Sequence, residues 1–250
     1  MNDLYSVKPI VLGAIRKLMT FVFLMFAAAV TTAAQPEGQT LLDTGIPKVL
    51  LIGDSISCQY TPYVIKQLHG KAIVKHHKGN AGPTMRGVAH IDTWLGTTEW
   101  DVIHFNWGLW DMYGWRYMEV DRSPKAYEER LETLVLRLKK TGAKLIWATT
   151  TPICPKAERT GGITLTPEIE KTYLDAAERV MKKHGIQVND LHSFTKARRN
   201  EFALADNDVH FNTEGRKEHA KQVAKHIMIA VSGEAAAPPR TVLPQGITHR

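Results

Sequence analysis

Residues 48–57 have the sequence Lys-Val-Leu-Leu-Ile-Gly-Asp-Ser-Ile-Ser, and this stretch decides the fold that we predict. The apolar run Val49–Ile52 lies between Pro47 and Gly53, as expected of a strand buried in a parallel sheet. A Gly-Asp-Ser turn leads from this strand into a helix, so the Ser55 hydroxyl is expected at the helix start, where backbone N–H groups lack partners inside the helix. The stretch therefore predicts a reactive or ligand-binding position directly after the first strand.

The strand-then-helix pattern of this first segment continues along the chain. Further strands are expected at 72–76, 102–105, 144–149 and 186–189. Helices are expected at 62–68, 85–95, 124–141, 167–183 and from 213 onward. In the second of these, Val88, Ile91 and Leu95 are expected to face inward. The third has an N-cap at Ser123 and ends at the turn at Gly142. This alternation predicts an α/β fold with a parallel sheet covered by helices on both faces, and ligands of such sheets bind beyond the carboxyl ends of the strands.

A second motif, Asp-Asn-Asp-Val-His-Phe-Asn at 206–212, stands just before the final helix. A serine attacks a carbonyl at neutral pH only when a base takes its proton, and histidine is suited to that task because its pKa lies near the working pH. A nearby carboxylate can then orient the imidazole and stabilise its charged form. Ser55 and His210 are therefore our candidate nucleophile and base.

These two motifs together resemble the first and last conserved blocks of the SGNH (GDSL-like) hydrolases, over about residues 48–229. The resemblance implies a flavodoxin-like, three-layer αβα fold with a five-stranded parallel sheet. It also implies ester hydrolysis through an acyl-enzyme on Ser55, without a cofactor. Ser55 lies in Gly-Asp-Ser-Ile-Ser, so the chain does not match the G-x-S-x-G pattern of other serine hydrolases.

The middle blocks fit the resemblance less closely. Gly82, in Gly-Pro-Thr, occupies the place of the glycine whose N–H the family uses in its oxyanion hole. The family's Gly-x-Asn-Asp block is Gly-Leu-Trp-Asp at 108–111, so Trp110 stands where asparagine is expected. An indole N–H can donate one hydrogen bond. Trp110 and the nearby Asn106 are thus competing candidates for the third donor, and we favour Asn106.

The acid that orients His210 is also left open by the sequence. The family pattern is Asp-x-x-His, but Asn207 stands three residues before the histidine, flanked by Asp206 and Asp208. An asparagine accepts a hydrogen bond without supplying charge. We favour Asp208, and a Ser–His pair supported by a backbone carbonyl is the alternative.

The N-terminal segment has the pattern of a signal peptide. Basic residues precede the apolar run 18–30, and small residues follow it, which predicts a cleaved signal at 1–34. The run is shorter than the ~20 residues of a spanning helix, so no stable membrane insertion is expected after cleavage. We expect a linker at 35–46, the hydrolase domain at 47–231 and a disordered tail at 232–250, in a secreted or periplasmic protein.

Charge and cysteine usage exclude several other functions. The formal net charge is +7, but the basic residues are scattered, so no nucleic-acid partner is predicted. The 11 histidines include no H-E-x-x-H motif and the chain has 2 cysteines, so no metal site is predicted. A disulfide between Cys58 and Cys154 is not favoured, because the two residues are not expected on adjacent strands.

Aromatic residues gather after the third strand, close to the expected active edge: Trp107, Trp110, Tyr113, Trp115 and Tyr117. Such rings can stack on sugars, or they can simply pack the loop onto the domain. We therefore predict an esterase for a small-molecule or polysaccharide ester, with an O-acetylated carbohydrate preferred. The alternatives are a carbohydrate-binding protein with weakened catalysis, and a hydrolase of lipid esters or glycosidic bonds on the same fold.

Overall fold

Five parallel strands form the centre of the computed structural model, which describes residues 45–117, 119–154, 156–157 and 165–233. The sheet order is β2-β1-β3-β4-β5, as in flavodoxin-like folds. The strands are β1 (Lys48–Ile52), β2 (Ile73–His76), β3 (Val102–Phe105), β4 (Lys144–Ala148) and β5 (Gln187–Asn189). The α/β class and the five-stranded parallel sheet predicted from the sequence are confirmed. The predicted signal peptide, most of the linker and the tail beyond Gly233 lie outside the described residues.

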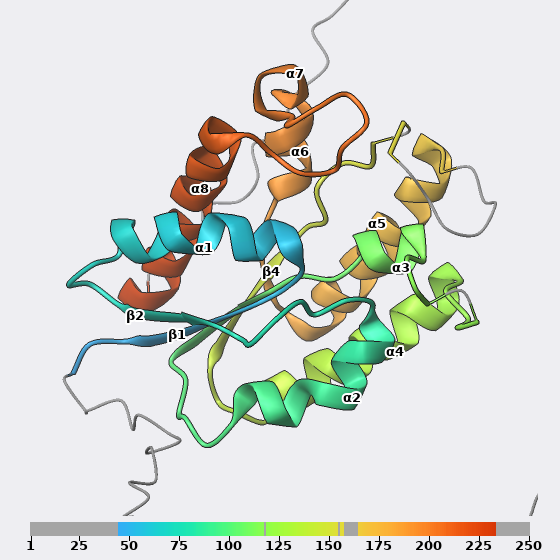
Figure 1. Ribbon diagram of the computed structural model, residues 1–250. Coiled ribbons are helices and arrows are strands. Elements are labelled where there is room, and N and C mark those ends of the chain that lie inside the picture. The colour runs from blue at the N-terminus through green and yellow to red at the C-terminus, as the bar shows by residue number, and fades with distance from the viewer. Residues whose placement is uncertain (1–44, 118, 155, 158–164, 234–250) are drawn as a thin grey trace, which may run out of the picture. The chain divides into compact units, whose positions relative to one another are not determined.

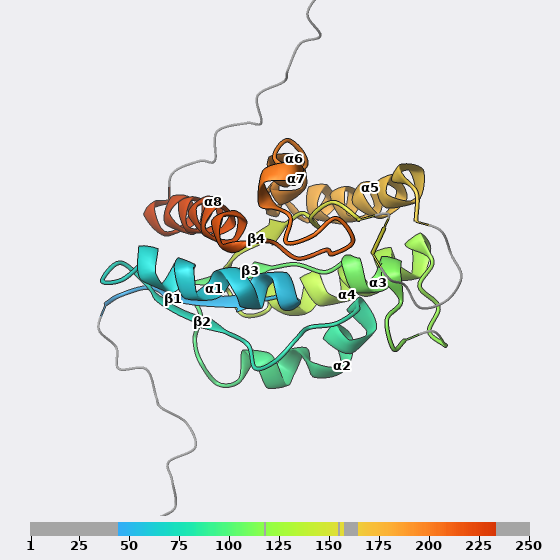
Figure 2. The same cartoon turned by 45° about the horizontal axis from the view of Figure 1, so that its top comes forward.

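Helices cover both faces of this sheet. Figures 1 and 2 show α1 and α8 side by side on one side and α2 on the other, where α2, α4 and α5 pack in succession. The helices are α1 (Ser55–Gln67), α2 (Thr84–Leu95), α3 (Leu109–Tyr113), α4 (Pro124–Lys139), α5 (Pro167–His184), α6 (Leu191–Lys196), α7 (Arg199–Phe202) and α8 (Thr213–Ser232). The resulting three layers place the ends of β1 and β3 at the middle of one sheet edge.

Helix α1 begins at Ser55, so the prediction that it starts at Pro62 was wrong. The Asp54 carboxylate accepts the Ile56 N–H at 3.0 Å and caps the helix directly at the turn. Pro62 removes one backbone hydrogen bond from the helix interior. The buried side chains of Ile56, Tyr60 and Val64 hold the helix against the core despite this loss.

The inner face of α2 also differs from the prediction, because Val88 is 40% exposed whereas Ile91 and Leu95 are buried as expected. Gly87 takes the inward position instead. A Cβ at Gly87 would lie 2.8 Å from the Trp107 ring, so only glycine permits this close approach. The short helices α3, α6 and α7 were not predicted, because each is too short to show a clear hydrophobic period.

Two further features concern the described helices and the cysteines. None of the described helices is both long and apolar enough to cross a membrane. Cys58 is exposed and Cys154 is buried, and both are free thiols in this structure.

Candidate active site

The structure brings Ser55 and His210 together at the carboxyl edge of the sheet, although 155 residues separate them in the chain. The Ser55 Oγ lies 2.8 Å from the His210 Nε2. Ser55 is the first residue of α1, and His210 lies in the loop that leads into α8. This contact is the one that the two sequence motifs required.

Backbone contacts hold the histidine loop in a tight shape. Ala203 and Phe211 form an antiparallel bridge, and the Leu204 N–H donates to the His210 carbonyl at 3.0 Å. The Arg199 guanidinium donates to the carbonyl of Asp208 at 2.6 Å. Arg199 was not predicted as a site residue, because its contact is to a backbone carbonyl that the sequence pattern does not reveal.

Asp208 is the carboxylate that contacts the imidazole. Its Oδ1 lies 2.6 Å from the His210 Nδ1 and also accepts the His210 backbone N–H at 2.9 Å. Partial burial pushes the pKa of Asp208 upward, but these hydrogen bonds outweigh burial and leave the pKa below its ordinary value. The Asp206 carboxylate instead lies 3.5 Å from Lys156 and is 92% exposed. Asn207 is exposed.

The carboxylate contact fixes how the imidazole is used. An ionised carboxylate only accepts hydrogen bonds, so the Nδ1 of a neutral His210 carries the proton that faces Asp208. The Nε2 then presents its lone pair to Ser55, and the serine hydroxyl donates to it. This is the arrangement in which a histidine can take the proton of a serine as the serine attacks a carbonyl.

Ser55 itself offers a free backbone donor, whereas Gly82 does not. As the first helical residue, Ser55 has an N–H with no hydrogen-bond partner among the described residues. The Gly82 N–H donates to the Asn80 Oδ1 at 2.7 Å. An asparagine that bonds the backbone two residues ahead is a recognisable turn signal, although our sequence reasoning missed Asn80.

The two candidates for the third oxyanion donor also differ in availability. The Asn106 amide donates to the Ala148 carbonyl at 2.8 Å and to the Thr150 Oγ1 at 3.4 Å, which ties the end of β3 to the end of β4. The Trp110 indole N–H has no hydrogen-bond partner within the part of the chain that the structure describes. The favoured assignment to Asn106 therefore requires an amide that is already engaged, and we transfer the proposed role to Trp110.

A buried carboxylate joins the two segments that carry these candidates. Asp111 is 0% exposed, and its carboxylate accepts from the Thr84 N–H at 3.0 Å and the Thr84 Oγ1 at 2.5 Å. Burial raises the pKa of Asp111 to about 6, although the Thr84 hydrogen bonds and Arg130 oppose the rise. Asp111 thus fixes Trp110, its neighbour in α3, relative to Gly82 and Pro83.

Asp111→Asn is expected to change how the free energy of unfolding depends on pH. Because the pKa rises from 3.8 to about 6 on folding, the native protein binds the extra proton between these pH values. The contribution of the Asp111 carboxyl to the free energy of unfolding is therefore fully present below pH 4 and is lost as the pH rises through 6. The loss amounts to about 3 kcal/mol. Urea unfolding at pH 4 to 7 should show the wild type losing that amount relative to the variant. If the free energy of unfolding changed with pH in the same way in both proteins, the raised pKa of Asp111 would be contradicted.

The aromatic residues of this region divide into two groups. Trp107 and Tyr113 are each 1% exposed and belong to the core. Trp110, Trp115 and Tyr117 are half-buried, with the Trp110 ring edge-on to Trp115 at 5.2 Å and to Tyr117 at 6.0 Å. The second group, which we call the aromatic cluster, is partly exposed to solvent.

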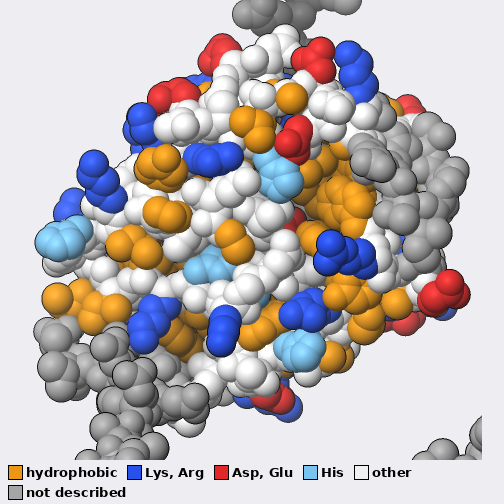
Figure 3. All heavy atoms as spheres, in the orientation of Figure 1, with side chains coloured by type: hydrophobic (Ala, Val, Ile, Leu, Met, Phe, Trp, Pro, Cys, Tyr) orange, Lys and Arg blue, Asp and Glu red, His pale blue; other side chains and the backbone are white. Residues whose placement is uncertain are grey.

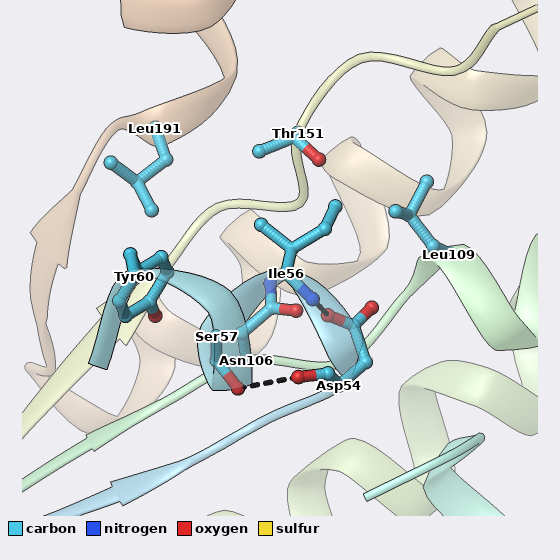
Figure 4. A pocket seen from close by; sticks show the side chains of 8 residues that line it. All are labelled: Asp54, Ile56, Ser57, Tyr60, Asn106, Leu109, Thr151 and Leu191. Carbon is cyan, nitrogen blue, oxygen red and sulfur yellow. Dashed lines mark hydrogen bonds between the residues drawn. The ribbon is translucent and has the colours of Figure 1, made fainter. Parts of the chain in front are cut away.

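A small hollow lies next to the nucleophile turn (Figure 4). In that view the side chains of Leu109, Thr151 and Leu191 surround Ile56, and Ser57 donates to the Asp54 carbonyl at 2.7 Å. The hollow has a volume of about 10 Å³. That is room for little more than one water molecule.

Within the described ranges, no three or more His, Cys, Asp or Glu side chains are grouped so that they could hold a metal ion.

Comparisons with known proteins identify the fold. No family model and no curated protein matches the sequence. Solved structures do match. The acetyl xylan esterase AlAXEase is 15% identical with a TM-score of 0.57, covering 72% of this chain and 99% of its own. The lipase/acylhydrolase from Enterococcus faecalis is 17% identical with a TM-score of 0.61, and the match covers 75% of this chain and 97% of that one.

A third similar structure is a mutant of Axe2, an acetyl-xylooligosaccharide esterase from Geobacillus Stearmophilus. It is 16% identical with a TM-score of 0.56, and the match covers 72% of this chain and 94% of that one. Each match spans nearly the whole of the other protein, so the likeness extends to the complete domain. The chain therefore has the three-layer αβα fold that its resemblance to the SGNH hydrolases implied.

Proposed function

We propose that this protein is a serine esterase that hydrolyses carboxylic esters through a covalent acyl-enzyme. The observation that carries the proposal is the continuous chain from Ser55 through His210 to Asp208, with contacts of 2.8 Å and 2.6 Å. The fold shared with esterases and lipases supports the same reaction class. The signal-peptide pattern supports a secreted or periplasmic location for it.

In the proposed mechanism, the Ser55 Oγ attacks the acyl carbon while its proton passes to the His210 Nε2. The carbonyl oxygen becomes an oxyanion, which the Ser55 N–H and the Trp110 indole N–H stabilise. The C–O bond to the alcohol then breaks, and the alcohol leaves with the proton from His210. A water molecule next attacks the acyl-enzyme and gives a proton to His210. The bond between the acyl carbon and the Ser55 Oγ then breaks, His210 returns the proton to Ser55, and the acid is released.

An O-acetylated carbohydrate is the proposed substrate. The half-buried rings of the aromatic cluster offer flat apolar surface of the kind on which sugar rings stack. Two of the similar structures are esterases of acetylated xylan or xylo-oligosaccharide.

A weakened or inactive carbohydrate-binding protein is the second candidate, because one specific observation favours it. The Gly82 N–H and the Asn106 amide are both engaged within the protein, so two of the three expected oxyanion donors are occupied. Loss of one such donor typically costs about 3 kcal/mol of transition-state stabilisation.

One labelling experiment separates these two candidates. We expect a fluorophosphonate probe to add to one residue of the folded protein, and peptide mass spectrometry to place the adduct on Ser55. In parallel, the protein should release acetate from acetylated xylan. Glycan binding without an adduct on Ser55 and without acetate release would instead establish the binding protein.

Trp110→Phe tests the proposed oxyanion donor. The change removes the indole N–H and keeps an aromatic ring, so kcat for p-nitrophenyl acetate should fall about 100-fold. The matched control is Trp107→Phe, since the buried Trp107 Nε1 has no hydrogen-bond partner among the described residues that could be lost. Equal kcat values for the two variants would remove Trp110 from the oxyanion hole.

A further inference from the structure

A second and larger pocket opens between the edge strand β2 and helix α2. Its volume is about 380 Å³, which falls in the range of small-molecule sites. Lys75, His77 and Lys78 line one side, and Thr93, Trp94 and Trp100 line the other. None of Ser55, Asp208 and His210 lines it, so the pocket is separate from the proposed catalytic group.

The inner walls of this pocket, which we call the β2 pocket, are aromatic. Trp100 is 8% exposed, and its indole N–H already donates to the Leu95 carbonyl at 2.9 Å. Trp94 is half-buried, and its ring lies 4.4 Å from the ring of His77. The walls therefore offer apolar ring surface, while β2, as the edge strand, leaves backbone groups on its outer side without a neighbouring strand.

Two lysines line the β2 pocket, and neither has a counter-ion among the described residues. Neither the Lys75 nor the Lys78 side chain has a hydrogen bond or ion pair with any residue in the described ranges, whereas Lys171, Lys183 and Lys221 each pair with a carboxylate. No Asp or Glu is among the described residues that line the pocket. Figure 3 shows basic and hydrophobic side chains intermingled over the region of β2 and α2.

Two histidines, His76 and His77, line the pocket, and they contribute structure rather than charge, because burial lowers the pKa of His76 to about 4 and also lowers that of His77. Burial lowers the pKa of His77, and the nearby Arg86 lowers it further, so the imidazole is neutral. The His77 Nε2 lies 3.0 Å from the Gly53 carbonyl, at the turn that carries Ser55. Through this contact the β2 pocket is connected to the turn that leads into the candidate active site.

We propose that the β2 pocket binds an acidic sugar residue, a uronate, of the polysaccharide whose ester the active site hydrolyses. A uronate combines an apolar ring face, which suits Trp94, with a carboxylate, which suits Lys75 and Lys78. The choice of a saccharide rests on the proposed function. The choice of an acidic saccharide rests on Lys75 and Lys78, which have no partner among the described residues, and on the lack of Asp or Glu among the described residues that line the pocket.

Binding to the Ser55→Ala protein tests this proposal without turnover. Isothermal titration would use tetragalacturonate and its methyl-esterified, uncharged form at physiological salt. We expect the charged oligosaccharide to bind at least tenfold more tightly than the neutral one. Lys75→Gln with Lys78→Gln should weaken that binding at least tenfold, and Thr93→Glu, which adds a negative charge at an exposed helix position, should weaken it similarly.

Lys139→Gln with Lys140→Gln is the matched control, because it removes the same charge from exposed positions at the end of α4. Equal weakening by both lysine pairs would show non-specific attraction and overturn the proposal. No binding of tetragalacturonate, or tighter binding of ATP as a probe for nucleotides, would also overturn it. Esterase activity of the wild type on p-nitrophenyl acetate is measured separately, so failure of the proposed function would be recognised independently.

Discussion

Replacement of Ser55 by alanine is expected to lower kcat for p-nitrophenyl acetate by at least about 10⁴-fold. The variant loses the atom that forms the acyl-enzyme, while the free N–H donors and the imidazole remain in place. The residual rate then comes from oxyanion stabilisation and binding alone. Stopped-flow measurement should also show a burst of p-nitrophenol in the wild type, wherever deacylation is slower than acylation, and none in the variant.

Ser57→Ala provides the control within the same helix. The Ser57 hydroxyl is buried and, among the described residues, makes its hydrogen bonds with the Asp54 carbonyl and the His76 Nε2, each at 2.7 Å. This variant is expected to lose some stability and to keep its acyl-enzyme chemistry. If Ser55→Ala retained the wild-type rate, or if both serine variants lost activity equally without unfolding, Ser55 would not be the nucleophile.

Replacement of Asp208 by asparagine is expected to lower kcat by about 10⁴-fold. An amide at this position can donate to the His210 Nδ1, which favours the tautomer with its proton on Nε2. His210 could then no longer accept the serine proton. The lost charge also removes stabilisation of the imidazolium. Steady-state kinetics across pH 5 to 9 would measure the loss, and KM should change little.

Asp206→Asn is the matched comparison two residues earlier. Its side chain is 92% exposed and faces Lys156, so the same change of charge should leave kcat near the wild-type value. A larger loss in Asp206→Asn than in Asp208→Asn would mean that Asp206 orients the imidazole instead. Equal wild-type rates in both variants would favour a Ser–His pair supported by the backbone.

The sequence by itself determined the elements whose signals are local. The apolar run of β1, the N-cap at Ser123 with Pro124 after it, and the motif around His210 each depend on residues close together in the chain. The parallel sheet followed from the alternation of strands and helices. These signals were sufficient to place Ser55 and His210 at one edge of the sheet, as found.

Only the tertiary structure decided which neighbours complete the site. Asp206 and Asp208 have the same side chain and flank the same asparagine, and the path of the 203–212 loop turns just one of them toward the imidazole. The engagement of Asn106 with Ala148 joins positions 42 residues apart. Such contacts depend on how separate elements pack, and local periodicity carries no information about them. The hydrogen-bond partners of a side chain are therefore set by the assembled fold, whereas its place on a strand or helix is set by its own segment.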